Sequence, residues 1–77
     1  MSKPKRVFSG AFVITILVRK FDFAVVSQRG SHVKLRSGRY GWTTIVPLHK
    51  ELAPGTLDGV LHLAGLNRKA FLKAIEK

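Results

Sequence analysis

The sequence contains no cysteine. This absence excludes disulfide bonds and thiolate metal ligands, and it fits a reducing compartment. Acidic residues are few as well: 4 of the 77 residues are Asp or Glu, against 14 Lys or Arg, so the formal net charge is +10. The acids are Asp22, Glu51, Asp58 and Glu76. They are too dispersed to favour a mechanism based on paired carboxylates.

Long apolar segments are also missing. The apolar run at residues 11–18 is too short to span a bilayer, and Arg19 and Lys20 end it. The G-x-S-x-G motif and Gly-rich phosphate-binding loops do not occur, so serine hydrolase, P-loop and dinucleotide-binding readings have no support. We expect a cytoplasmic protein that does not enter a membrane, with a basic lead-in at residues 1–8 and a single domain at 9–77.

The positive charge is concentrated in the middle of the chain. Residues 23–50 contain no acid, and they contain five cations: Arg29, Lys34, Arg36, Arg39 and Lys50. An evenly solvated basic surface is the plainer explanation of a high net charge. The clustering instead favours a basic patch, which is typical of proteins that bind nucleic acid.

The order of predicted elements indicates an α+β fold. Ser9 can cap a helix over residues 10–20, although the β-branched run inside it would by itself favour a strand. Residues 23–29, 32–36 and 42–47 read as three antiparallel strands joined by short turns. Pro54 begins a helix that ends at Gly65, and Asn67 caps a last helix over 68–77. We therefore expect a three-stranded antiparallel sheet with helices packed on one face and the other face free.

The middle strand carries the most informative alternation. Side chains of a strand point to opposite faces in turn, so Val33 and Leu35 share one face. His32, Lys34 and Arg36 share the other face. The apolar pair requires a core, and the second set predicts an imidazole between cations on the free face of the sheet.

Several short motifs follow one another at characteristic intervals. They are Ser-Gly at 9–10, Gln-Arg-Gly-Ser-His at 28–32, Val-Pro-Leu-His at 46–49, Glu-Leu-Ala-Pro-Gly-Thr-Leu at 51–57 and Ala-Gly-Leu at 64–66. In this order the sequence resembles the HicA (YcfA-like) toxin family. The resemblance implies a double-stranded-RNA-binding-domain-like fold and a small ribonuclease that cleaves mRNA without a known metal requirement. It also implies a HicB-like antitoxin that neutralises the protein, and it places the family's catalytic histidine at His32.

Two positions depart from the family pattern. Relatives usually carry several charges in the first helix, whereas residues 11–18 have none. This helix is therefore expected either to face a partner subunit, which includes self-association, or to be unusually buried. Relatives commonly have glycine before the aromatic residue of the first strand, and Asp22 stands there in this sequence. We expect this aspartate to alter the turn between the helix and the strand.

The candidate catalytic residue is His32. RNA cleavage requires a proton to leave the 2′-OH or to reach the 5′-oxygen, and imidazole exchanges protons near neutral pH. The sequence leaves open whether His32 is the base, the acid or both. Lys34 and Arg36 could stabilise charge on the phosphorane, or they could be solvated strand charges. The third histidine, His62, is predicted to be peripheral.

The remaining candidates are predicted to bind RNA. Arg29, Arg39 and Lys50 are expected to contact the phosphate backbone. Gly30 could allow close approach of a phosphate, although a tight hairpin explains it slightly better, and Ser31 could bind a phosphate or complete the turn. His49 is expected to have a structural or RNA-positioning role. The histidines lack the spacing of a zinc site, so we expect no metal and no cofactor.

Two aromatic residues near the start of the third strand allow two interpretations. Tyr40 and Trp42 could stack on an unpaired base, or they could pack against the domain, and packing is the prediction for Trp42. The function predicted for the chain is a metal-independent endoribonuclease that cleaves mRNA, with an acidic HicB-like antitoxin covering His32. The alternatives are a non-catalytic module that binds double-stranded RNA and a structural protein associated with the ribosome.

Overall fold

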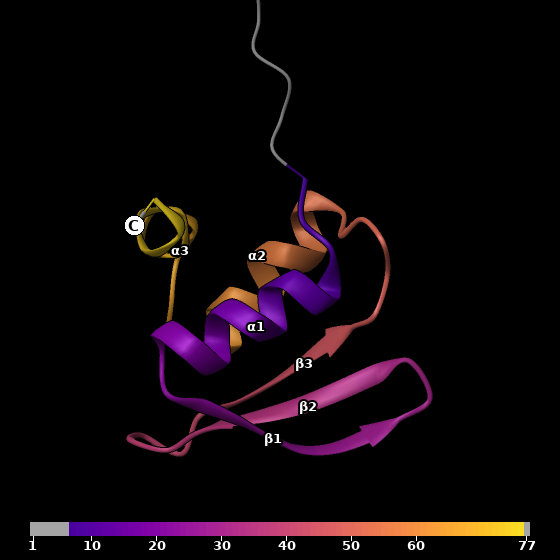
Figure 1. Ribbon diagram of the computed structural model, residues 1–77, viewed down its shortest axis with the longest axis vertical. Coiled ribbons are helices and arrows are strands. Elements are labelled where there is room, and N and C mark those ends of the chain that lie inside the picture. Colours follow the sequence, from indigo (N-terminus) through magenta and orange to yellow (C-terminus); the bar gives the residue numbers. More distant parts are fainter. Residues whose placement is uncertain (1–6, 77) are drawn as a thin grey trace, which may run out of the picture.

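A computed structural model describes residues 7–76 of the chain, so residues 1–6 of the predicted basic lead-in (residues 1–8) and the last residue, Lys77, lie outside the described part. The elements are α1 (Gly10–Lys20), β1 (Phe23–Arg29), β2 (His32–Ser37), β3 (Thr43–Pro47), α2 (Pro54–Leu63) and α3 (Arg68–Ile75). The strands form one antiparallel sheet in the order β1-β2-β3, and the helices lie on one side of it (Figure 1). The predicted α+β class is confirmed.

Helix α1 forms despite its β-branched sequence because its first turn is capped. The Ser9 hydroxyl accepts a hydrogen bond of 3.0 Å from the backbone N–H of Phe12, which satisfies one of the free donors of the first turn. Val13, Ile16 and Leu17 form the buried stripe of the helix. Their helical spacing allows the apolar run to bury one face against β1 and β3.

The start of α1 fits closely against the end of β3. The backbone N–H of Gly10 donates a hydrogen bond of 2.9 Å to the carbonyl of His49. A Cβ atom at Gly10 would overlap with the carbonyl of Pro47, so the absence of a side chain allows this approach. Phe8, the last residue of the predicted lead-in, is buried and packs edge-on against Phe71 with ring centroids 5.4 Å apart. The packed domain therefore includes Phe8.

An irregularity in β1 sets which side chains reach the free face. Val25 pairs with Leu35, but the next pair is Ser27 with Lys34, so Val26 is an extra residue in the strand. Because alternation has a period of two, this β-bulge reverses the orientation of the rest of β1. Arg29 then pairs with His32 and lies on the same face of the sheet.

The turn between β1 and β2 contains only Gly30 and Ser31. Gly30 adopts φ +58°, in the left-handed region, as expected for the first central position of a two-residue hairpin turn. The Gln28 side-chain amide donates a hydrogen bond of 2.9 Å to the carbonyl of Gly30. The backbone conformation thus gives this glycine a structural role.

Gly30→Ala is expected to lower the free energy of unfolding by about 1 kcal/mol, because alanine is strained in the left-handed region. Beyond the two neighbouring residues, no atom of residues 7–76 lies within 4 Å of the added Cβ, so a steric clash contributes nothing. Gly59→Ala is the matched control, since Gly59 lies in the middle of α2 with equally open surroundings. It should raise stability by about 0.5–1 kcal/mol. Thermal melts of both variants check the pair, and a Gly30→Ala melt equal to that of the parent would contradict the assignment.

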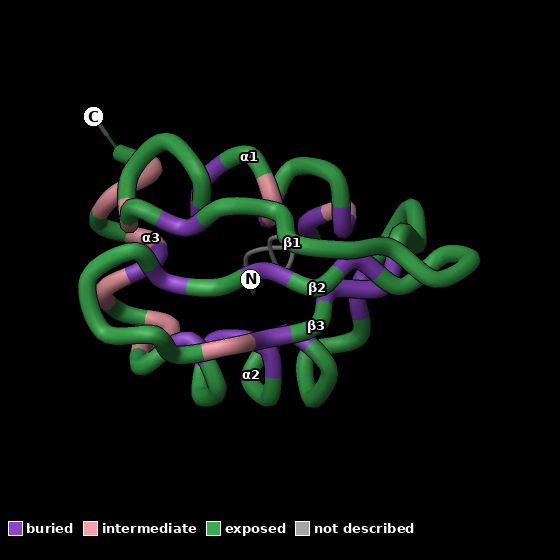
Figure 2. Tube along the Cα trace, turned by 90° about the horizontal axis from the view of Figure 1, so that it is seen from below, coloured by how far each residue is buried: buried purple, intermediate pink, exposed green. Residues whose placement is uncertain are grey.

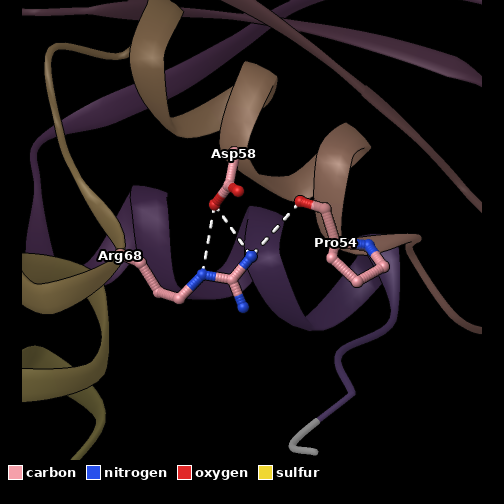
Figure 3. Close-up of polar contacts among 3 residues, drawn as sticks. All are labelled: Pro54, Asp58 and Arg68. Atoms are coloured by element: carbon pink, nitrogen blue, oxygen red, sulfur yellow. Dashed lines mark hydrogen bonds and ion pairs between the residues drawn. The ribbon is translucent and has the colours of Figure 1, made fainter.

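Helices α2 and α3 complete the layer above the sheet. Leu57, Val60 and Leu61 form the predicted buried stripe of α2, and the Val60 carbonyl accepts a hydrogen bond of 2.8 Å from the buried Thr44 hydroxyl of β3. The Arg68 guanidinium at the start of α3 donates to the Asp58 carboxylate at 2.8 and 3.1 Å and to the Pro54 carbonyl at 3.2 Å (Figure 3). These exposed contacts link the start of α3 to the first turns of α2.

Element boundaries differ slightly from the prediction. Strand β2 extends to Ser37, whose side chain is buried, and β3 begins at Thr43 because Trp42 belongs to the preceding turn. Asp22 adopts φ +62° between α1 and β1, a left-handed conformation that aspartate tolerates better than most residues. No helix among residues 7–76 is long and apolar enough to cross a membrane.

Candidate active site

The free face of the sheet presents the side chains that the alternation of β2 predicts. Val33 and Leu35 are buried beneath the helices, while His32, Lys34 and Arg36 are exposed. Figure 2 shows β2 as the central strand with buried and exposed residues alternating along it. The predicted orientation of the imidazole and its neighbouring cations is therefore confirmed.

His32 lies in a hollow of about 350 Å³ on this face. The hollow is lined by residues from all three strands: Ser27, Arg29, His32, Lys34 and Ile45. Arg29 is placed beside His32 by the antiparallel register, and Lys34 pairs with Ser27 on one side and with Ile45 on the other. An imidazole, a guanidinium and an ammonium group thus surround one small surface.

The charge of this face is not neutralised within the described chain. Among residues 7–76 the only ion pair joins Arg68 to Asp58, far along the sequence in the helical layer. The side chains of Arg29, His32 and Lys34 form no hydrogen bond within the same part of the chain. Exposed cations without carboxylate partners favour binding of an anion such as a phosphodiester.

Gly30, Ser31, His49 and Lys50 lie at the same end of the sheet as His32. The Ser31 carbonyl accepts a hydrogen bond of 2.7 Å from the N–H of Leu48, which ties the β1–β2 turn to the segment after β3. His49 and Lys50 follow directly and are exposed, but they do not line the hollow. Their predicted contacts with RNA would be made beside the hollow.

Arg39 lies at the opposite end of the sheet, in the β2–β3 turn. It lines a separate hollow of about 340 Å³ together with Lys20, Asp22 and Tyr40. Arg36 lies near this same end of β2, where it pairs with Thr43, the first residue of β3. The predicted set of cations is therefore an extended surface with His32 near one end, and only Arg29 and Lys34 directly accompany the imidazole.

Ser27 and Ile45 also line the hollow, and neither is among the site residues predicted from the sequence. Ile45 could have been found from the alternation of β3, since it lies between the inward-facing Thr44 and Val46. Ser27 could not, because the bulge at Val26 reverses the alternation of β1 without a sequence signal. Within residues 7–76, no three His, Asp or Glu side chains are grouped so that they could hold a metal ion.

The fold and the site define a class of protein: a small α+β domain with an open basic sheet face and an exposed histidine. Comparison with protein families narrows this class, because residues 13–66 match the family described as the HicA toxin of bacterial toxin-antitoxin systems. The chain belongs to this family and is the toxin of such a system. The matched segment contains every candidate site residue from Arg29 to Lys50. No curated protein and no solved structure matches the chain significantly.

Proposed function

We propose that this toxin is an endoribonuclease that cleaves mRNA in the cytoplasm, with His32 as its catalytic residue. The observation that supports the proposal is the exposed imidazole between Arg29 and Lys34, on a face whose cations have no carboxylate partners in the described chain. A polyanion with a scissile phosphodiester fits both the charge of this face and a side chain that can donate and accept protons.

The reaction follows from the groups present. The 2′-oxygen of the substrate attacks the neighbouring phosphorus, the bond from phosphorus to the 5′-oxygen breaks, and a cyclic phosphate and a free 5′-hydroxyl result. One proton leaves the 2′-OH and one reaches the departing 5′-oxygen, and His32 transfers a proton at one or both of these atoms. Arg29 and Lys34 stabilise the additional negative charge on the phosphorane, because they line the same hollow.

The direct test is incubation of the purified protein with labelled RNA in the presence of EDTA. Fragments that accumulate in EDTA support a metal-independent nuclease. If the protein binds double-stranded RNA and leaves it intact, the nuclease proposal is wrong and the protein is a non-catalytic binding module. If the protein sediments with ribosomes and cleaves no RNA, the nuclease proposal is wrong and a structural role on the ribosome takes its place.

Lys34→Gln is expected to lower kcat by about tenfold or more, because its ammonium group lies beside the reacting phosphate. Lys50→Gln is the matched control, since Lys50 is exposed outside the hollow. It should weaken RNA binding and reduce the slope of log affinity against log salt by about one, with kcat retained. Single-turnover kinetics at several salt concentrations separate the two effects. Equal losses of kcat in both variants would contradict the distinction.

We further propose that a HicB-like antitoxin with an acidic surface covers the hollow and neutralises the toxin. Charge complementarity supports this partner, because the open face carries Arg29, Lys34 and Arg36 and no acid. Adding the antitoxin should stop cleavage when one antitoxin binding site is present for each toxin molecule. It should also protect His32 from chemical modification. An inhibited complex in which His32 still reacts would contradict occlusion of the site.

A further inference from the structure

Two aromatic rings stack on each other at the end of the sheet opposite to His32. Tyr40 and Trp42 lie in the β2–β3 turn with ring centroids 4.4 Å apart and planes inclined by 20°. Their exposed fractions are 60% and 44%, respectively. At this exposure Tyr40 contributes little to the core, so its pairing with Trp42 requires another explanation.

The turn that carries the rings is fixed by a buried serine. The Ser37 hydroxyl, in a residue that is 5% exposed, accepts hydrogen bonds from the N–H groups of Arg39 at 3.2 Å and Tyr40 at 3.0 Å. The Ser37 N–H donates to the Trp42 carbonyl at 2.7 Å, and its carbonyl accepts from Gly41 at 3.0 Å. A turn held in this way presents its side chains with a small entropic cost on binding.

The order of the rings leaves Tyr40 as the outer one. A Cβ atom at Gly65 would overlap with the Trp42 indole, so this ring lies directly against the backbone at the end of α2. Trp42 is therefore packed against the domain, as predicted, and it supports Tyr40 from beneath. Together the two rings, the aromatic pair, form a platform for a further planar group.

Cations flank the aromatic pair. The Arg39 guanidinium lies over the face of the Tyr40 ring, 6.0 Å from its centroid, so it must shift toward the adjacent phosphate when a base stacks on this ring. The Arg36 guanidinium lies beside Gly41, 3.5 Å from where a Cβ would stand. The acid at this end is Asp22, next to Gly38, and it shares its hollow with Lys20 and Arg39. The platform thus combines an aromatic surface with an excess of positive charge.

We propose that the aromatic pair is a stacking site for an unpaired RNA base, with Arg36 and Arg39 contacting the adjacent phosphates. The inference builds on the proposed function and specifies its substrate as single-stranded RNA at this position. Exposed aromatics beside cations bind single strands in this way, whereas the bases of a duplex are already stacked on one another. His32 and Arg36 are separated by about 13 Å along β2, so the stacked base lies several nucleotides from the scissile phosphate.

The test measures binding with a probe that cannot be cleaved through its own 2′-oxygen. A fluorescein-labelled 2′-O-methyl oligouridine of about ten nucleotides covers a site of this kind. Tyr40→Leu should weaken its binding about tenfold, and Tyr40→Phe should retain the affinity. Phe12→Leu is the control, because Phe12 is an exposed aromatic of α1 in the helical layer. A strand of equal length with abasic sugars should bind wild type and Tyr40→Leu alike.

Trp42 gives a second signal, because it is the only tryptophan of the chain. Its fluorescence should be quenched by the oligouridine and not by the abasic strand. Equal affinity of Tyr40→Leu and wild type for the oligouridine, or an equal loss on the abasic strand, would overturn the proposal. If either of these outcomes is found and the protein still cleaves RNA in EDTA, the stacking site is wrong and the nuclease proposal stands. Tyr40-dependent binding without any cleavage leaves the stacking site and removes the nuclease.

Discussion

His32→Ala is expected to reduce the rate of RNA cleavage by about 10²–10⁴-fold, which is the usual contribution of a general acid or base. Binding should change little, because the affinity of this surface for RNA comes chiefly from the Arg and Lys side chains around His32. The fold should also persist, since His32 is exposed and its side chain forms no hydrogen bond among residues 7–76. Single-turnover cleavage of labelled RNA measures the effect.

The chain contains suitable controls for this experiment. His62→Ala removes an exposed histidine from α2, on the opposite side of the sheet from the hollow, and should cleave at the wild-type rate. His32→Gln keeps a polar side chain of similar size but cannot transfer a proton at neutral pH, so it should be as slow as His32→Ala. Circular dichroism confirms folding of each variant. Wild-type cleavage by either His32 variant would refute the catalytic assignment.

Gly10→Ala is expected to lower the free energy of unfolding by about 2 kcal/mol or more, although alanine is normally the better helix residue. The added Cβ would overlap with the Pro47 carbonyl, and the next nearest atom outside that carbonyl is the Cα of Leu48. Both belong to the backbone, so no side-chain rotation relieves the contact. The start of α1 must move away, which weakens the hydrogen bond from Gly10 to His49.

Gly55→Ala is the comparison for this variant. Gly55 lies in the first turn of α2, as Gly10 does in α1, but no atom lies within 4 Å of its added Cβ. Its melting temperature should equal or slightly exceed that of the parent, whereas Gly10→Ala should melt lower by about 10 °C or more. Equal melting of the two variants would show that α1 does not depend on close contact with β3.

The sequence predicted the elements well where local chemistry decides. Ser9 and Asn67 cap the helices that follow them, and the alternation of β2 correctly placed His32 on the free face. In α1 the apolar run could form either a helix or a strand, and the capping hydroxyl identified the correct alternative. Gly30 and Gly65 have positive φ values where the turns require them.

The site was harder to predict because it depends on register and on contacts between distant segments. Nothing in the sequence around Val26 marks the bulge, so the sequence alone could not show that the side chains of Ser27 and Arg29 lie on the free face of the sheet. The contact of Trp42 with Gly65 joins residues far apart in the chain, and only the fold reveals that it supports Tyr40. The burial of Phe8 likewise depends on Phe71, which lies on the last helix.

The bulge has a consequence for the solubility of the toxin. Strand β1 forms one edge of the sheet, and Val25 and Val26 on it are 50% and 51% exposed. A regular apolar edge is a template to which strands of other molecules can add, and this is a common start of aggregation. The extra residue interrupts the even spacing of the free backbone groups along this edge. The same residue that turns Arg29 toward His32 therefore also hinders the growth of intermolecular sheets.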